Sequence, residues 1–272
     1  MLSLMIMIMS NDKPVPNVPA LERGLDVLEG MLTQESALTL TAIARRCGRS
    51  VSELQRVVTC LHHRGYLLRD ALGAYRVSSK LFRMGQACTP FQELLVHAWA
   101  PMRQFAGQTG QSVHISVLSE DQLLILANVS GTGYLQLGVT AGSTHDPIIS
   151  ASGRVLLASM DSKELLGLLK RNRVSAQQAG PLQLRLGLIR QRGYELVQSH
   201  LYRGVYDLAL CAPAQDGSLV AAVACSYLRP RQGLQGQQMP APARLLQKLR
   251  HCAGGISAAC EPQAIACEEE VR

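Results

Sequence analysis

Leucines recur along the first part of the chain with the spacing of one helix face. They follow one another at steps of four, three and four residues, at Leu21, Leu25, Leu28 and Leu32. Side chains three or four residues apart share a face of an α-helix. This spacing therefore predicts an amphipathic helix over residues 20–33.

Two further helices are predicted on either side of Gly48. Thr39 and Thr41 offer capping hydroxyls to a short second helix, and its apolar face is formed by Leu40, Ile43, Ala44 and Cys47. Gly48 tolerates the left-handed backbone that a tight turn between helices needs. Ser50 can cap a third helix over residues 50–64.

The third predicted helix has an apolar side and a polar side. On a helical wheel the apolar side collects Val51, Leu54, Val57, Val58 and Leu61. The opposite side collects Ser52, Arg56, Thr59 and His63, flanked by Glu53 and Gln55. Such a helix suits the major groove of DNA, because arginine can bind guanine O6 and N7 and glutamate can accept from cytosine N4.

A short β-hairpin is predicted after this helix, which ends at Gly65. Residues 66–69 and 74–77 have the composition of strands, and residues 70–73 form the turn between them. Three helices followed by a hairpin are the elements of a winged helix-turn-helix. From the hairpin, arginines could reach DNA phosphates.

Positive charge is concentrated in the same segment. The chain has 272 residues and a formal net charge of +7, and residues 41–69 hold six arginines and a single acid. A solvated helix face in a protein-binding domain is the alternative, but the order of elements and the one-sided charge favour DNA. The residues that we expect to contact DNA are Arg45, Arg46, Arg49, Ser50, Ser52, Glu53, Gln55, Arg56, Thr59, His63, Arg69 and Arg76.

The rest of the chain alternates between helix and strand signals. A helix broken at Gly85 and Pro90 is predicted from about residue 79 to 97, followed by a helix over residues 99–109 with Pro101 in its first turn. Strands are predicted over residues 112–118, 123–129, 134–139, 194–198, 207–214 and 219–227, the last two joined by a turn at Asp216 and Gly217. Helices are predicted over residues 152–160, 162–171, 181–192 and 241–259. This mixture indicates an α+β domain.

A candidate ligand site lies where the loop over residues 150–153 runs into a helix. Exposed N–H groups at a helix start favour an anionic group such as a carboxylate. Gly153 would allow the backbone to approach the ligand closely.

Several classes of protein are disfavoured by what the sequence lacks. It has no nucleophile elbow, Walker A loop, zinc-protease motif or dinucleotide glycine pattern, so we expect neither an enzyme nor a cofactor. Its eight cysteines form no C-x-x-C pair and show no zinc-finger spacing, which favours buried free thiols in the reducing cytoplasm and no metal site. The apolar residues 1–9 are too few to span a bilayer and lack the features of a signal peptide, so we expect no membrane contact.

Several segments, in order and spacing, resemble the isocitrate lyase regulator (IclR) family of bacterial transcription factors. In the N-terminal part these are residues 20–28, 56–61, 64–66, 75–77 and 81–85. In the C-terminal part they are Gly142, residues 150–158 and 192–194, Gly204, Ala209, residues 216–217 and 220–223, and Ser226. The resemblance covers about residues 20–260.

The resemblance implies a domain plan and a pocket. It implies a tail over residues 1–17, a winged helix-turn-helix over 18–79, a linker helix over 80–98, a GAF-like α+β effector-binding domain over 99–262 and a tail over 263–272. It also implies a homodimer or homotetramer that binds double-stranded operator DNA and a small-molecule effector. The expected effector-binding residues are Ser152, Gly153, Asp207, Cys211 and Ser226.

The sequence departs from the family pattern at several of these places. Ser52 and Glu53 stand where Ser-Thr is common in the recognition helix. His200 stands where an acid is common, Cys211 where proline is common, and Ala224 replaces a frequent serine. We therefore do not copy the effector from any relative. A structural role is the favoured interpretation of His114 and His200.

Two other functions stay open at this point. One is a ligand sensor whose N-terminal domain binds a protein partner, and the other is a small-molecule hydrolase with a regulatory head. Salt-sensitive DNA binding would separate the regulator from the first, and turnover of a ligand would support the second.

Overall fold

The computed structural model describes residues 18–32, 36–86, 89–133, 135–200, 202–213, 220–228 and 241–259. The chain divides into two compact units, Met1–Cys88 and Thr89–Arg272, and each is described by itself. The boundary falls inside the predicted linker over residues 80–98. Helix α4 (Lys80–Gln86) therefore belongs to the first unit and α5 (Thr89–Thr109) to the second.

Capping side chains set the helix starts in the first unit. Thr39 accepts a hydrogen bond from the N–H of Ala42 at the start of α2 (Leu40–Arg46). Ser50 caps α3 (Val51–His63) in a capping box with Glu53. Between them Gly48 has a φ of +62°, the left-handed conformation expected for the tight turn.

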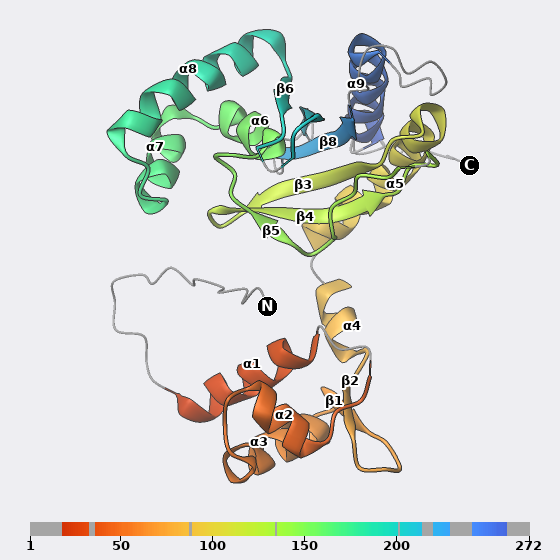
Figure 1. Ribbon diagram of the computed structural model, residues 1–272, viewed down its shortest axis with the longest axis vertical. Coiled ribbons are helices and arrows are strands. Elements are labelled where there is room, and N and C mark those ends of the chain that lie inside the picture. Colours follow the sequence, from red (N-terminus) through yellow and green to blue (C-terminus); the bar gives the residue numbers. More distant parts are fainter. Residues whose placement is uncertain are drawn as a thin grey trace, which may run out of the picture. The chain divides into compact units, whose positions relative to one another are not determined.

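The predicted winged helix-turn-helix is confirmed. Helix α1 (Pro19–Leu32) precedes α2 and α3, and strands β1 (Leu67–Arg69) and β2 (Tyr75–Val77) pair antiparallel to form the wing (Figure 1). The backbone of Leu38 bridges to Tyr75 and extends this small sheet. The core of the unit consists of Val27, Met31, Ile43, Ala44, Leu54, Val58, Leu67 and Tyr75.

The buried face of α1 differs from the expected one. Leu21 and Leu32 are 58% and 61% exposed, whereas Val27 and Met31 are buried. The leucine spacing is therefore a correct sign of a helix but marks the wrong face, because α2 and α3 pack against Val27 and Met31. Within the described residues, the leucine face of α1 stays largely open.

The second unit is built on a six-stranded antiparallel sheet of order β5-β4-β3-β8-β7-β6. Its strands are β3 (Val113–Ser119), β4 (Gln122–Val129), β5 (Thr144–His145), β6 (Glu195–Gln198), β7 (Val205–Pro213) and β8 (Val220–Leu228). Its other helices are α6 (Ala151–Ser159), α7 (Ser162–Arg171), α8 (Ala176–Arg192) and α9 (Pro242–Ala259).

Alternation along the strands divides the core between the two faces of the sheet. On β8, Val223 and Cys225 pack in the cluster that contains residues of α5 and α9. Ala222 and Ala224 pack in the other cluster, with residues of α6, α7 and α8. Figure 1 shows these two groups of helices on either side of the sheet. The predicted α+β architecture is confirmed.

Two expectations for this unit are wrong. Residues 135–139 form no strand, and β4 pairs instead with the short β5. Pro101 lies inside α5 rather than in a first turn, because the helix already begins at Thr89. The predicted turn at Asp216 and Gly217 lies outside the described residues.

An ion-pair cluster joins α8 to the edge strand β6. Glu195 is fully buried, and its carboxylate accepts from Arg185 at 2.5 and 2.8 Å and from Arg192 at 2.7 Å. A buried carboxylate needs such partners, because leaving it unpaired would be strongly destabilising. The cluster therefore fixes α8 on the sheet.

Candidate functional site

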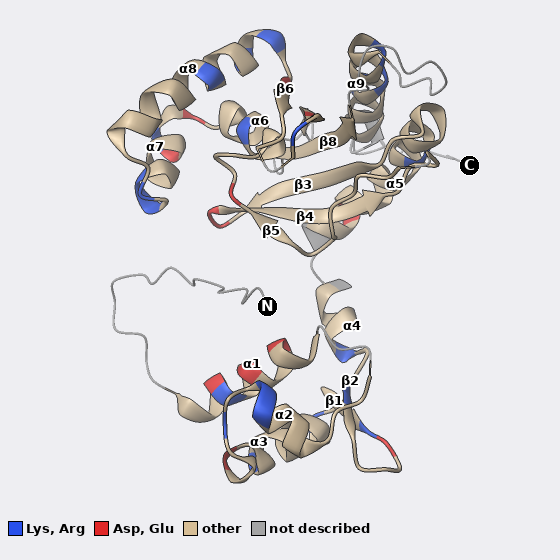
Figure 2. Ribbon diagram, viewed as in Figure 1, with Lys and Arg blue, Asp and Glu red and all other residues tan. Residues whose placement is uncertain are grey.

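The polar face of α3 is exposed, as the helical wheel predicts. Its open side chains are Ser52, Gln55, Arg56, Thr59 and His63, while Leu54 and Val58 are buried beneath them. The hydroxyl of Thr59 donates to the carbonyl of Gln55, at 2.8 Å. Figure 2 shows further basic residues on α2 and on the wing. The unit thus presents an exposed basic surface around α3.

The arginines of this surface fall into two groups. In the described part of the chain, the side chains of Arg45, Arg56 and Arg76 make no hydrogen bond or ion pair with protein, and all three are exposed. Arg49 instead donates to Asp26 on α1, with its Nη2 2.9 Å from Oδ2, and this bond raises its pKa. Arg46 donates to the carbonyl of Gly30. The first group is available for phosphates or bases, and the second holds α1 against α2 and the turn that follows it.

Ser50 and Glu53 are occupied at the start of α3. The carboxylate of Glu53 accepts from the N–H of Ser50 at 2.9 Å and from its hydroxyl at 2.7 Å. These bonds lower the pKa of Glu53. A cytosine contact by Glu53, expected from the sequence, would compete with this cap.

The wing is a stiff hairpin with a basic edge. Asp70 accepts from the N–H groups of Leu72 and Ala74, which fixes the turn. The guanidinium of Arg69 lies 5.5 Å from the centre of the Tyr75 ring, within cation–π range. Interactions within the hairpin therefore hold the turn and the side chain of Arg69 in place.

The start of α4 is attached to the end of α3. Lys80 Nζ donates to the carbonyl of Arg64 at 2.8 Å and lies 4.2 Å from the centre of the Tyr66 ring. The Ser78 hydroxyl donates to the carbonyl of Gly65. The helix that leaves the first unit is therefore tied to α3.

The second unit contains a cavity of about 190 Å³ on the sheet face covered by α6. It is lined by His114, Leu123, Ile125, Leu137, Gly138, Val139, His145, Ser150, Ala151, Ser152, Ser199, His200, Tyr202, Val205, Asp207, Ala224 and Ser226. Its wall is therefore formed by the start of α6, by strands β3, β4, β5, β7 and β8, and by the loops before β5, α6 and β7. Three of the five predicted effector residues are among them: Ser152, Asp207 and Ser226.

Gly153 and Cys211 do not line this cavity. A Cβ on Gly153 would overlap the carbonyl oxygen of Pro147, so this glycine serves close packing within the protein. The thiol of Cys211 donates to the carbonyl of Val155, 3.1 Å away, and burial raises its pKa to about 11. Gly153 thus packs α6 against the loop at Pro147, and Cys211 connects α6 to strand β7.

Asp207 and Ser226 form a polar pair in the cavity wall. They are cross-strand partners on β7 and β8, and the Ser226 hydroxyl donates to Asp207 Oδ1 at 2.6 Å. Burial raises the pKa of Asp207, while the bond from Ser226 and the nearby His200 act against this rise. Position on the same face of adjacent strands brings the two side chains together.

His114 and His145 belong to the site, although the sequence favours a structural role for His114. The Nε2 of His114 lies 3.1 Å from the Ser152 hydroxyl, and burial lowers the pKa of His114 to about 4. It is therefore neutral at pH 7. Burial also lowers the pKa of His145, whose Nε2 lies 3.0 Å from the Ser143 hydroxyl. A histidine in an otherwise apolar strand is the signal by which the sequence could identify His114.

The described residues were also compared with the expectations for metal sites, cysteines and membrane-spanning helices. No group of three or more His, Cys, Asp and Glu side chains there could hold a metal ion. The described cysteines are free thiols, and Cys60 is exposed, contrary to the expectation of buried thiols. No described helix is both long enough and apolar enough to cross a membrane.

Curated relatives resemble most of the chain. The transcriptional repressor IclR of Escherichia coli (strain K12) is 24% identical over 218 residues, which cover 77% of this chain and 80% of the relative. The HTH-type transcriptional regulator BhcR of Paracoccus denitrificans (strain Pd 1222) is 29% identical over 220 residues, 78% of each chain.

Solved structures share the fold. An IclR homologue from Microbacterium hydrocarbonoxydans, in complex with 4-hydroxybenzoate, has a TM-score of 0.72 at 22% identity and covers 89% of this chain and 98% of its own. The IclR of Thermotoga maritima has a TM-score of 0.67 at 20% identity, covering 88% and 98%.

Family models match both units. Residues 20–71 match the IclR helix-turn-helix domain. Residues 88–258 match the model described as bacterial transcriptional regulator IclR C-terminal, which covers more than half of the chain. The chain belongs to the IclR family of bacterial transcriptional regulators.

Proposed function

We propose that α3 binds operator DNA in the major groove and that a small molecule in the cavity changes this binding. The observation that carries the proposal is the set of exposed arginines without protein partners on a winged helix-turn-helix, within the described part of the chain. Arginine without an intramolecular partner can bind guanine or phosphate at no cost of a broken ion pair.

The basic residues divide between reading and positioning. Arg56 lies on the exposed face of α3, flanked by Ser52, Gln55, Thr59 and His63, and it would contact base edges. Arg45 and Arg76, with Arg69, would bind phosphates, because they lie on α2 and the wing; Arg46, which the sequence places with them, already donates to the carbonyl of Gly30. Phosphate contacts position a protein on DNA, and base contacts supply the sequence preference.

The effector would be a small organic acid or aromatic compound. The cavity includes the first residues of α6, where the N–H groups of Ala151 and Ser152 favour an anionic group. The related protein from Microbacterium hydrocarbonoxydans was crystallised with 4-hydroxybenzoate, a compound of this kind. The effector would bind one arrangement of the protein better than another and so shift operator affinity.

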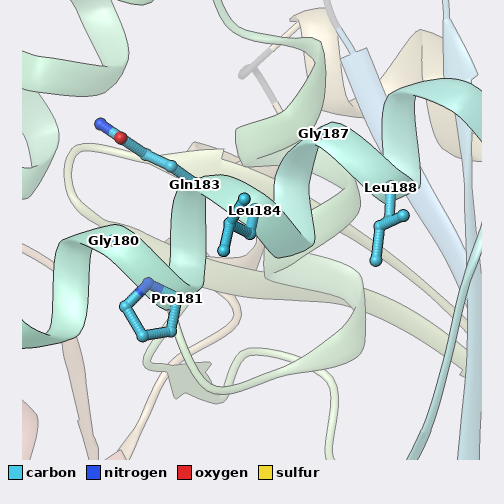
Figure 3. Close-up of a pocket in the computed structure, with 6 residues that line it drawn as sticks. All are labelled: Gly180, Pro181, Gln183, Leu184, Gly187 and Leu188. Atoms are coloured by element: carbon cyan, nitrogen blue, oxygen red, sulfur yellow. The ribbon is translucent and has the colours of Figure 1, made fainter.

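Self-association would supply a second copy of α3 for a partly palindromic operator. We propose a homodimer or homotetramer, supported by apolar side chains left open on helices of both units. On α1 these include Leu21 and Leu32. On α8, Leu184 and Leu188 are 75% and 51% exposed beside Gly180 and Gly187 (Figure 3).

We further propose that the protein acts in the cytoplasm and carries no catalytic activity of its own. Relatives named as transcriptional regulators support both points. Within the described residues, the cavity pairs its polar groups two by two, Asp207 with Ser226 and His114 with Ser152, and no hydrogen bond joins His114 to an acidic side chain that would complete a catalytic triad.

Gel-shift titration of the full chain with fragments from its own upstream region tests the proposal. We expect binding that weakens by roughly 10³-fold or more between 50 and 200 mM salt, as counterion release requires. Absence of salt-sensitive binding to any fragment, with and without small organic acids, would overturn it. Salt-insensitive binding of a protein partner would favour the alternative of a protein-binding head.

A further inference from the structure

Leu72 lies at the tip of the wing, where its side chain is almost fully open to solvent. It is 93% exposed, the highest fraction among the large hydrophobic side chains that the structure describes. It also lies outside the described hydrophobic clusters. Burial of a leucine away from water is favourable, and here only a partner could provide it. Since isolated exposed leucines are common on protein surfaces, the turn and its surroundings decide whether this one has a role.

The turn that carries Leu72 is held by four hydrogen bonds. The N–H groups of Leu72 and Ala74 donate to Asp70 Oδ1 at 3.0 and 2.8 Å. The N–H of Gly73 donates to the Asp70 carbonyl at 3.1 Å, and the N–H of Asp70 donates to the Ala74 carbonyl at 2.9 Å. At the base of the turn, Tyr75 is buried in the core of the unit. The apolar tip is therefore presented at a fixed place, and little conformational entropy is lost when a partner covers it.

A groove separates this tip from the end of α3. It is lined by His62 of α3 and by residues 69–73 of the wing. The Arg69 guanidinium lies beside the turn, because its Nη2 would be 3.2 Å from a Cβ added at Gly73. Among the described residues it makes no hydrogen bond or ion pair, and the carboxylate of Asp70 in the same groove is bonded to the turn through Oδ1. The groove thus combines an available cation with an apolar tip.

The position of this groove in the first unit indicates duplex DNA as the partner. The wing tip and α3 both lie at the end of the unit away from α4 (Figure 1). A helix in the major groove and a hairpin tip in the adjacent minor groove must lie on either side of one phosphate backbone. The groove leaves room for that backbone, and Arg69 supplies a positive charge to it. DNA therefore accounts for the apolar tip, the groove and the cation together.

We propose that Leu72 acts as an apolar wedge that enters the minor groove, opens one base step in each half-site and bends the operator. Apolar side chains inserted in this way partly unstack the step and kink the duplex. Pyrimidine–purine steps such as TA deform at the lowest cost, whereas A-tracts are stiff. Leu72 then reads sequence through deformability, at a position where no base edge accepts or donates a hydrogen bond. This inference rests on the proposed DNA binding by α3.

Two measurements with the full chain test the wedge. The probe is a short duplex taken from the upstream fragment that binds most tightly in the gel shifts. Energy transfer between dyes at its two ends reports the bend, and 2-aminopurine placed at successive steps reports unstacking as a rise in fluorescence. We expect the wild type to bend the duplex and to raise the fluorescence at one step in each half-site. Leu72→Ser should lose both signals and bind ~10-fold more weakly, at an unchanged melting temperature.

Further variants separate a wedge from a general loss of apolar surface. Leu72→Met keeps an apolar side chain of similar volume and should keep the bend and the fluorescence. Leu166→Ser is the matched control, because it removes a leucine that is 50% exposed on α7 of the second unit, and it should behave as the wild type. A change of the opened step to AA should weaken wild-type binding ~10-fold and affect Leu72→Ser much less, since only an opened step pays for its stiffness.

The proposal is overturned if the wild type leaves the duplex straight, if 2-aminopurine stays quenched at every step, or if Leu72→Ser keeps both signals. It is also overturned if Leu72→Ser changes the sedimentation mass of the DNA-free protein, because the tip would then contact a second copy of the chain. Salt-sensitive DNA binding without a bend removes only the wedge. Absence of DNA binding by the wild type removes the proposed function and the wedge with it.

Discussion

The exposed basic surface around α3, which we propose binds DNA, and the cavity of the second unit differ in how their polar side chains are paired. On the first unit, Arg45, Arg56 and Arg76 are exposed, charged and without protein partners among the described residues. In the second unit, the polar groups are paired with each other, as in Ser226 with Asp207 and His114 with Ser152. This difference fits the two proposed roles. The exposed arginines suit a highly charged partner such as DNA, and the cavity suits a small molecule.

Desolvation explains the difference. An exposed charge keeps its hydration, so it is not destabilised. An exposed arginine is attracted to a phosphate over about one Debye length, roughly 8–10 Å. A charge inside a cavity loses hydration, so burial lowers the pKa of His114 and raises that of Asp207. Binding at the surface then depends on which arginine side chains have no protein partner, and binding in the cavity depends on the shape of the wall and on the paired polar groups that line it.

The largest expected effect tests how rigidly the cavity wall is built. Gly153→Ala would place a Cβ well inside van der Waals contact with the carbonyl oxygen of Pro147, a backbone atom with little freedom to move. We expect the second unit to lose about 3 kcal/mol or more of stability. Urea unfolding followed by the fluorescence of Trp99, the chain's single tryptophan, reports on this unit.

A second helical glycine provides the control. A Cβ added to Gly254 on α9 would meet no atom within 4 Å, so Gly254→Ala should stabilise the unit by roughly 0.5–1 kcal/mol through helix propensity. Equal effects of the two substitutions would contradict the close packing of α6 on the loop at Pro147.

The next effect tests the neutral state of the cavity histidine. Because the pKa of His114 is about 4 when folded and near 6.5 when unfolded, the unfolded state binds the extra proton between these values. The stabilisation is therefore complete above pH 6.5 and is lost as pH falls towards 4, by about 3 kcal/mol at most. Unfolding of wild type and His114→Gln across this range, read by Trp99 fluorescence, should show a steeper loss in the wild type.

The two proteins share every other titrating group, so their difference isolates the histidine. Parallel pH dependences would mean that His114 stays hydrated and titrates as an ordinary histidine. The contrast between a charged surface and a neutralised cavity would then no longer hold at this residue.

The sequence predicts the first unit better than the second. Caps such as Thr39 and Ser50 and the turn at Gly48 act within a few residues, so local chemistry identifies them. The cavity depends on contacts between distant segments. Leu137 and Val139 alternate as in a strand, but they turn inward as a loop that lines the cavity without pairing.

The same limit explains the errors in the candidate site. The sequence predicts that Gly153 approaches a ligand, but it approaches Pro147, and no local pattern distinguishes these cases. The structural role that the sequence favours for His114 stays a prediction, because only the tertiary fold brings this residue opposite Ser152 in the cavity wall. Asp207 and Ser226 are predicted through the family resemblance rather than through spacing.

A smaller effect separates the free arginines from the paired ones. We expect Arg56→Ala to weaken operator binding by about 1–3 kcal/mol, roughly 5- to 150-fold, with little change in melting temperature. Arg49→Ala should lower the melting temperature, because it leaves Asp26 without its partner. Gel shifts and thermal melts on both variants make the comparison. If instead Arg56→Ala lowered the melting temperature and Arg49→Ala weakened operator binding, the open face of α3 would not supply the base contacts.

The smallest effect concerns Ser50 and Glu53, where cap and predicted DNA contact coincide. Ser50→Ala removes the cap of α3 and should cost about 1 kcal/mol of stability in the first unit. Glu53→Gln keeps an acceptor that can complete the capping box, so its stability should stay close to wild type. Operator variants changed one base pair at a time then decide the second role. If Glu53 only caps, Glu53→Gln keeps the wild-type order of affinities. If it also accepts from cytosine N4, as the sequence predicts, loss of the carboxylate charge weakens that hydrogen bond and the preference relaxes at one position only.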